Sequence, residues 1–189
     1  MFPQPADEKL VARTLAGDRH AYRILMERYY RIVFRLCRSI LRHAEDAEDA
    51  TQEVFVRAFQ SLGQFAGRGA FGGWLRRLTV NHCLNRTQTV SARVAAKSYS
   101  LDTLTESLQT SREADPEEQL LRSEEQKRIH DELDLLPPQQ RVALALRLLE
   151  GLTYEEIADI MGVPVNSVRS WLHRGRTRLR EALQEVVEC

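Results

Sequence analysis

The C-terminal part of the sequence carries a concentrated group of side chains that can bind a polyanion. Between residues 165 and 183 the chain has five arginines and a single acidic residue, Glu181. Arginine presents a planar fork of N–H donors that fits phosphate and the edge of guanine in a bidentate manner. The whole chain is neutral, with 27 basic and 27 acidic residues, so this local excess of positive charge predicts a contact surface for nucleic acid.

Helical spacing divides these side chains by expected role. Side chains that point outward near the start of a helix beginning at Val165 can enter the major groove of DNA, and a bidentate arginine–guanine contact is worth about 1–3 kcal/mol of discrimination. The residues expected to contact bases are Asn166, Arg169, Ser170, His173 and Arg174. The later Arg176 and Arg178 suit contacts with phosphates.

The residues just before this helix predict a helix-turn-helix over about 153–174. Thr153 and Glu156 have the spacing of a capping box, in which each side chain bonds the other residue's backbone N–H. Gly162 suits a turn that needs positive φ, and Pro164 favours the start of the next helix, which we expect to run from Val165 to about Val187. The alternative is a helical hairpin whose basic face is merely solvated.

A second group, from Phe65 to Arg86, combines aromatic and arginine side chains around a loop with five glycines between Gly63 and Gly73. Proteins bind single-stranded nucleic acid with such residues: the bases stack on aromatic rings, and guanidiniums lie along the phosphate backbone of the nucleic acid. The candidate residues are Phe71, Trp74, Arg76, Arg77, Asn81 and Arg86. The alternative is that the aromatic rings belong to the core, that the loop is only a connector and that Asn81 is a satisfied core amide.

A third group forms an acidic helix face. Asp46, Asp49, Gln52 and Glu53 lie three or four residues apart, opposite an apolar stripe that includes Val54 and Ala58. Such a face is usually only solvated, and its carboxylates repel DNA. If it binds a partner, that partner is a protein with basic side chains.

Apolar residues recur at helical rather than alternating spacing, so we expect an all-α protein without strands. The expected helices are Asp7–Ala16, Ala21–Ile40, about Ala47–Leu62, about Phe71–Thr87, one from Leu120 through Leu136, Gln139–Glu150, and the two of the helix-turn-helix. Residues 88–118 are rich in Ser, Thr and acidic residues and poor in apolar ones, which predicts a flexible linker. The expected domains are therefore 1–87 and 119–189.

Composition excludes several classes of protein. The chain has 189 residues, which is enough for a substantial core, and no apolar run long enough to span a membrane. Three cysteines without paired spacing indicate neither a disulfide framework nor a zinc ribbon, and scattered histidines argue against a metal cluster. No phosphate loop or nucleophile–base set is present, so we expect a cytoplasmic protein that needs no cofactor and is not an enzyme.

Together these segments resemble the extracytoplasmic-function (ECF, group IV) sigma factors of bacterial RNA polymerase over nearly the whole chain. The N-terminal half resembles their region 2, in which Asp46–Phe55 corresponds to the stretch that binds core polymerase, and Phe71–Leu75 with Asn81 to the stretch that melts the promoter. The C-terminal part resembles region 4 at Leu136-Pro137, Gly151–Ala158 and Val168–Ser170. There is no space for regions 1 and 3 of housekeeping sigma factors.

The resemblance implies a two-domain promoter-specificity subunit that initiates transcription. Its implied partners are core RNA polymerase, through the clamp helices of the largest subunit and the flap of the second-largest, and promoter DNA, with the −35 element bound as duplex and the −10 element as a melted strand. An anti-sigma factor is a further implied partner, and no membrane insertion is implied. Two rivals remain: a response-regulator-like helix-turn-helix activator, which needs a β/α receiver domain, and a helical protein–protein adaptor.

Overall fold

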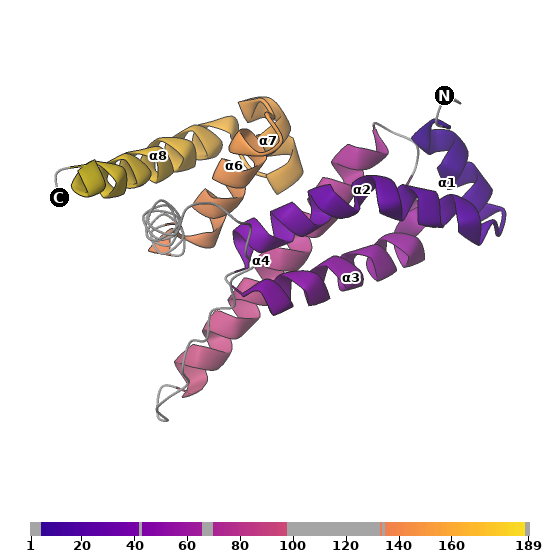
Figure 1. The fold of residues 1–189 in the computed structure, drawn as a ribbon, viewed down its shortest axis with the longest axis horizontal. Coiled ribbons are helices and arrows are strands. Elements are labelled where there is room, and N and C mark those ends of the chain that lie inside the picture. Colours follow the sequence, from indigo (N-terminus) through magenta and orange to yellow (C-terminus); the bar gives the residue numbers. More distant parts are fainter. Residues whose placement is uncertain (1–4, 42, 66–69, 98–132, 134, 188–189) are drawn as a thin grey trace, which may run out of the picture.

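The computed structural model describes residues 5–41, 43–65, 70–97, 133 and 135–187, and within these residues it contains helices and no strand (Figure 1). The elements are α1 (Asp7–Leu15), α2 (Arg19–Ile40), α3 (Ala44–Ser61), the short 3-10 helix η1 (Leu62–Gln64), α4 (Phe71–Lys97), α6 (Pro138–Leu148), α7 (Tyr154–Met161) and α8 (Val165–Val187). The expected all-α fold class is confirmed.

The turn between α1 and α2 follows from two residues. Gly17 has a φ of +96°, a conformation that glycine adopts without steric cost, and this ends α1. The side chain of Asp18 then accepts hydrogen bonds from the backbone N–H groups of His20 and Ala21, at 2.9 and 3.2 Å, and so caps α2. The chain reverses direction here, and α1 packs against α2.

α4 is longer than its apolar pattern predicts. We expect an end near Thr87, but the helix continues to Lys97, so residues 88–97 of the predicted linker are helical. This stretch contains no glycine or proline, and Ala92, Ala95 and Ala96 favour helix strongly. The rest of the predicted linker, and the predicted helix from Leu120, lie almost entirely outside the described residues.

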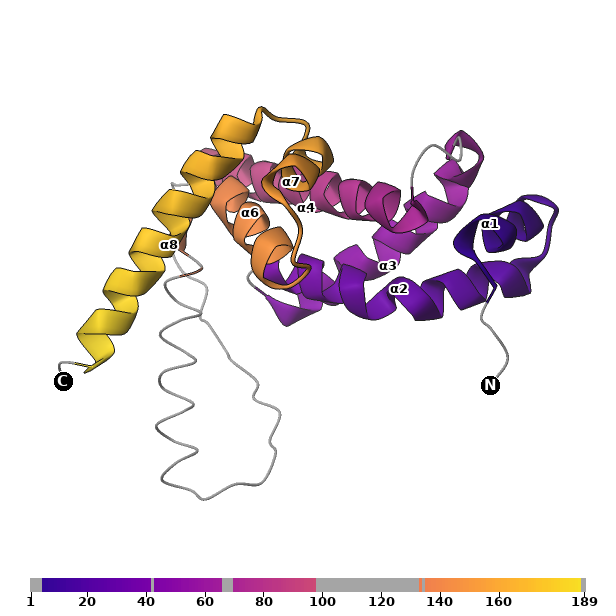
Figure 2. The ribbon, with the colours of Figure 1, turned by 90° about the horizontal axis from the view of Figure 1, so that it is seen from above.

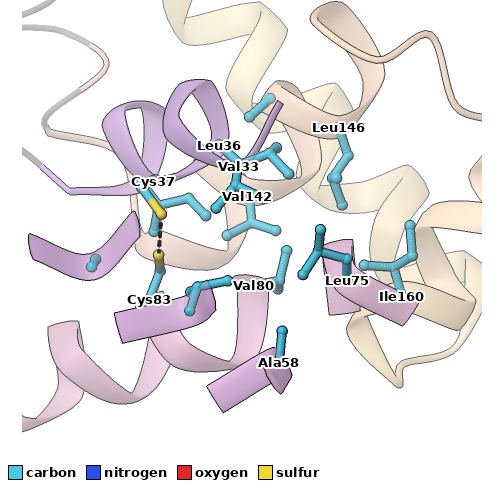
Figure 3. Close-up of a cluster of buried hydrophobic side chains, with 14 of the residues drawn as sticks. Val33, Leu36, Cys37, Ala58, Leu75, Val80, Cys83, Val142, Leu146 and Ile160 are labelled. Atoms are coloured by element: carbon cyan, nitrogen blue, oxygen red, sulfur yellow. Dashed lines mark hydrogen bonds between the residues drawn. The ribbon is translucent and has the colours of Figure 1, made fainter. Parts of the chain in front are cut away.

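α6 is the central helix of the molecule. Its residues from Val142 to Leu146 are all buried, as expected for a helix that is covered on every side. It packs against α2, α4, α7 and α8, and in Figure 2 it lies between α8 and the N-terminal helices. Figure 3 shows Val142 of α6 beside Val33 and Leu36 of α2, and Leu146 of α6 on the side of Leu75 of α4. One apolar core therefore joins the two halves of the chain.

The helix-turn-helix forms as its residues predict. The Thr153 side chain accepts from the Glu156 backbone N–H at 3.2 Å, while the Glu156 carboxylate accepts from the Thr153 backbone N–H at 2.8 Å. Gly162 closes α7 with a φ of +66°, and α8 begins at Val165. Gly175 lies where α8 crosses α6, and a Cβ there would meet the Leu144 side chain at 2.7 Å. The second helix is therefore held tightly against the core.

Two cysteines that are far apart in the sequence meet in the core. Cys37 of α2 and Cys83 of α4 are free thiols, both fully buried, with their Sγ atoms 3.6 Å apart (Figure 3). The hydrogen bond from the other thiol lowers the pKa of Cys37, whereas the same bond and burial raise the pKa of Cys83. Their separation in sequence gives no hint of this contact.

No helix in the described part of the chain combines the length and the apolar character that crossing a bilayer requires.

Candidate nucleic-acid and protein interfaces

The residues predicted to contact duplex DNA share one exposed face of α8. Asn166, Arg169, His173, Arg174, Arg176 and Arg178 are exposed, and Ser170 is half-buried. The opposite face packs through Val168 and Leu172, which are almost completely buried. The helix therefore turns its basic side chains to solvent because its apolar stripe is fixed in the core.

Two side-chain contacts order this face. The Arg174 guanidinium donates to the Ser170 hydroxyl at 2.7 and 3.2 Å, and Arg169 donates to the Asn166 side-chain oxygen at 3.5 Å. Each pair lies one helical turn apart. The two guanidiniums are thus held at successive turns near the start of the helix, which is the arrangement that the major groove requires.

The residues predicted to contact a melted strand do not all lie on one surface. Arg77 and Asn81 are exposed on α4, and both line an open groove of about 580 Å³ whose other wall is formed by residues 158–164, at the turn between α7 and α8. The alternative of Asn81 as a satisfied core amide is therefore wrong. Trp74 is half-buried and packs on Phe71 and Phe65, with ring centroids 5.5 Å away in each case.

Phe71 departs from the sequence prediction. Its side chain is only 2% exposed and makes edge-to-face contacts with Tyr29 and Phe65, at 5.4 and 5.7 Å. A ring that is almost completely buried offers no face to a base. In this arrangement Phe71 is a core residue that supports Trp74 and the start of α4.

The two arginines at the start of α4 are paired with carboxylates from the C-terminal half. Arg76 lies 2.8 Å from Glu150, and Arg77 lies 2.8 Å from Asp159 and also donates to the Asp159 backbone oxygen at 2.5 Å. The Glu150 side chain is 6% exposed, whereas that of Asp159 is 79% exposed. The first ion pair is therefore shielded from solvent and the second is at the surface.

Arg86 also departs from its predicted role. It donates to Asp46 at 2.6 Å and lies 3.8 Å from Asp49 and 3.6 Å from Glu53, so it bridges three residues of the acidic face of α3. Burial lowers the pKa of Arg86, but the hydrogen bond and charge of Asp46, with the other two carboxylates, outweigh this and raise it. Arg86 is thus engaged by α3 and does not present a free cation to DNA.

The acidic face itself remains accessible. Asp49, Gln52 and Glu53 are exposed and Asp46 is half-buried, all on the outer side of α3. Beside them lies His82, which is 6% exposed and whose Nε2 is 3.4 Å from the Glu53 carboxylate. Burial lowers the pKa of His82, and the charge of Arg57 acts in the same direction. His82 is not among the site residues that the sequence predicts, because its acidic neighbours are contributed by another helix.

Glu150 and Asp159 are the other residues that sequence reasoning missed. Glu150 is an ordinary acidic residue in the turn after α6 and Asp159 one on α7, and only the packing of the two halves brings them to α4. Within the described residues, no group of three or more His, Cys, Asp or Glu side chains is arranged to hold a metal ion.

Family models match both halves of the chain: "Sigma-70 region 2" at residues 25–92 and "Sigma-70, region 4" at residues 126–179. Among characterised proteins, the chain is 34% identical to the RNA polymerase sigma-H factor of Pseudomonas aeruginosa, over 99% of this chain and 98% of that protein. It is 35% identical to the ECF RNA polymerase sigma-E factor of Escherichia coli strain K12, over 99% of each.

Two solved structures share the fold. The sigma factor RpoE in complex with the anti-sigma factor NepR, from Bartonella quintana, superposes with a TM-score of 0.68 at 19% identity and covers 86% of this chain and 96% of that one. CnrH, in complex with the cytosolic domain of CnrY, superposes with a TM-score of 0.61 at 22% identity and covers 96% of this chain and 99% of that one.

Proposed function

This chain belongs to the extracytoplasmic-function sigma factors of the sigma-70 family and is an initiation factor that directs RNA polymerase to promoters, and we propose that it does so through three separate surfaces. These are the exposed face of α8, the start and middle of α4, and the outer face of α3. Each surface has its own chemistry, so each can be tested by its own substitution.

The −35 element binds as duplex to α8. Arg169 and Arg174 contact base edges with Asn166, Ser170 and His173, while Arg176 and Arg178 hold phosphates. The observation that carries this assignment is the division of α8 into a buried apolar stripe and an exposed basic face whose first three turns hold oriented guanidiniums.

The −10 element binds as a separated strand to α4. Arg76 and Arg77 hold its backbone, Asn81 bonds the edge of an unstacked base and Trp74 offers part of a ring for stacking. The exposure of Asn81 in the groove supports this role. We assign Phe71 and Arg86 to support of this surface rather than to contact with DNA.

Core polymerase binds the acidic face of α3. Asp49, Gln52 and Glu53 are exposed and dock on the clamp helices of the largest subunit, while Asp46 holds the face in place through Arg86. Region 4 contacts the flap of the second-largest subunit. An anti-sigma factor is a further proposed partner, because one of the solved neighbours above, RpoE with NepR, is a complex of this kind. The protein acts in the cytoplasm, where polymerase is found, and has no catalytic activity of its own.

The decisive experiment is in vitro transcription on genomic fragments with purified core enzyme and purified chain, followed by mapping of start sites. We expect initiation at a set of promoters that have one −35 sequence motif and one −10 sequence motif in common. The purified chain should need neither phosphorylation nor a small ligand for this activity. Arg174→Ala should reduce initiation at these promoters, while Glu27→Ala, which changes an exposed residue of α2, should not. Specific initiation that is equal for the wild type and Arg174→Ala contradicts the role assigned to α8.

A further inference from the structure

Cys37 and Cys83 are a pair of thiols that none of the three surfaces described above uses. Cys37 lies on α2 and Cys83 on α4, and both side chains are 0% exposed. In Figure 3 the two side chains point toward each other across the interface of these helices. The Cys83 thiol donates a hydrogen bond to the Cys37 sulfur at an Sγ–Sγ distance of 3.6 Å. The two sulfur atoms are therefore in contact before any covalent bond joins them.

A bond between these sulfur atoms requires only a small movement. An S–S bond is about 2.05 Å long, so the two Sγ atoms must approach each other by about 1.5 Å. Shared equally, this is about 0.8 Å for each sulfur, which a rotation of about 30° in each χ1 angle provides. The packing of α2 on α4 can therefore persist while the bond forms.

The two thiols differ in acidity, so their roles in an oxidation differ. The hydrogen bond from Cys83 lowers the pKa of Cys37, and the positive charge of Arg86 acts in the same direction, although burial opposes both. The hydrogen bond to Cys37 and burial raise the pKa of Cys83. Because the thiolate is the reactive form of cysteine, Cys37 is the thiol that attacks an oxidant and Cys83 is the one that resolves the product.

Burial decides which oxidants can react with this pair. The Thr51 side chain of α3 contacts Cys37 and is itself 0% exposed, whereas the nearby Arg86 is 25% exposed. The pair thus lies just beneath the surface that α3 and α4 share. Hydrogen peroxide is uncharged and close to water in size, so a local opening of the packing admits it, while a bulky disulfide needs a larger opening. A small peroxide is the class of oxidant that fits the site.

We propose that Cys37 and Cys83 form an oxidation site, at which a peroxide converts the two thiols to a disulfide that cross-links α2 to α4. The Cys37 thiolate attacks one oxygen of hydrogen peroxide, the O–O bond breaks, and Cys37 becomes a sulfenic acid. The hydroxide that leaves takes up the proton that the Cys37 thiol lost, which gives one water.

The second step uses the neighbouring thiol. The Cys83 sulfur attacks the Cys37 sulfur, the S–O bond breaks, and the departing hydroxyl takes the Cys83 proton as a second water. The two thiols together lose two electrons and two protons, and the peroxide gains them. The contact between the two sulfur atoms favours this step over further oxidation of the sulfenic acid.

The disulfide closes a loop that contains α3 and the start of α4. A cross-link lowers the conformational entropy of the unfolded chain, and the effect grows with the length of the closed loop. We therefore expect the oxidised N-terminal half to resist unfolding more strongly than the reduced one. This expectation does not depend on the roles that we propose for α3 and α4 in binding polymerase and DNA.

The test uses the full chain with Cys189→Ser, which leaves Cys37 and Cys83 as its only cysteines. The folded protein is treated with hydrogen peroxide, then unfolded and alkylated. We expect mass spectrometry to find both thiols protected from alkylation and the chain lighter by two hydrogen atoms, and non-reducing electrophoresis to show a monomer. The midpoint of urea unfolding should rise by about 1–2 M and return to the reduced value after treatment with dithiothreitol.

The matched control is Cys83→Ala in the same background, which keeps Cys37 and should show no reversible rise in the midpoint. If that variant does not fold, Cys37→Ala takes its place, because it removes the other partner of the same bond. A sulfinic acid at Cys37 beside an intact Cys83 thiol overturns the proposal, as do two thiols that survive peroxide in the folded chain. A disulfide that leaves the midpoint unchanged or lowers it overturns the cross-link of the folded helices.

Discussion

Arg86 of α4 donates a 2.6 Å hydrogen bond to the Asp46 carboxylate of α3, and this contact joins a helix that we assign to promoter DNA with one that we assign to polymerase. Asp49 and Glu53 lie within 4 Å of the same guanidinium. The acidic face is therefore not a set of independent solvated carboxylates. One cation beneath it reduces the mutual repulsion of three negative groups.

Charge reversal on this face should weaken assembly with core polymerase. Asp49→Lys changes the most exposed of the three carboxylates, 67% exposed, so it leaves the contact between Asp46 and Arg86 in place. We expect holoenzyme formation to weaken about tenfold, which corresponds to about 1.4 kcal/mol, because a basic partner surface then meets a cation. Titration of labelled core enzyme measures the Kd. Glu27→Lys on α2 is the control, and equal weakening by both variants contradicts the assignment.

Removal of Arg86 should affect stability rather than DNA binding. Arg86→Gln leaves the three carboxylates without their shared cation, and we expect a loss of about 1 kcal/mol in the free energy of unfolding, as is usual for partly exposed ion pairs. Urea unfolding followed by circular dichroism measures it. If Arg86 contacts a phosphate instead, Arg86→Gln should lose affinity for the −10 strand with little change in the free energy of unfolding. That result would support the sequence-based prediction that Arg86 binds the −10 element.

Substitutions on α8 should separate base contacts from phosphate contacts. Arg174→Ala should reduce the preference for the cognate −35 duplex over a mutated one, because a bidentate base contact distinguishes sequences. Arg176→Ala should weaken both duplexes alike and lower the dependence of log K on log salt by about one. Anisotropy titrations at several salt concentrations measure both quantities. If the two variants lose equal affinity on every duplex, the division of roles on α8 is wrong.

The stability of the N-terminal half should depend on the protonation of His82. Because burial lowers its pKa in the folded chain, the unfolded chain binds this proton more readily, near the ordinary histidine pKa of about 6.5. The contribution of His82 to stability is therefore complete above about pH 6.5 and is lost as the pH falls through the lower folded pKa. Urea unfolding at pH 7.5 and 5.5 should show this loss in the wild type and in His173→Gln, an exposed control, but less of it in His82→Gln.

Local features of this fold can be predicted from the sequence because they depend on neighbouring residues. The cap at Asp18 and the capping box at Thr153 each involve side chains within three residues of the backbone that they satisfy. The turn at Gly162 depends on the positive φ of the glycine itself. The exposed face of α8 follows in the same way from the spacing of Val168 and Leu172.

Contacts between distant segments are not encoded in such spacing. The ion pair of Arg76 with Glu150 joins residues 74 positions apart, and the contact of Cys37 with Cys83 joins residues 46 apart. Aromatic residues next to arginines resemble a stacking surface, so the sequence assigns Phe71 to DNA, whereas Tyr29, which packs against it, comes from another helix. These residues acquire their roles from packing, which a linear pattern does not specify.

The opening of the −10 element should depend on Asn81. The chain has no phosphate-loop motif, so the free energy for melting must come from binding of the separated strand rather than from a nucleotide. Extrusion of a base costs a few kcal/mol, and hydrogen bonds and stacking in a pocket can offset that cost. Asn81 is exposed one helical turn beyond Arg77 on the wall of the groove, where its amide can both donate to and accept from the edge of a base.

Asn81→Ala should therefore impair transcription from duplex promoters while it largely spares binding of the −35 duplex. A template with a pre-melted bubble at the −10 element should recover part of the activity, because the cost of opening has already been met. Gln60→Ala removes an exposed amide from α3 and should behave as the wild type on both templates. Permanganate footprinting of unpaired thymines reports melting directly. Normal melting by Asn81→Ala, or an equal loss on duplex and bubble templates by a correctly folded variant, contradicts a role for this amide in holding the opened strand.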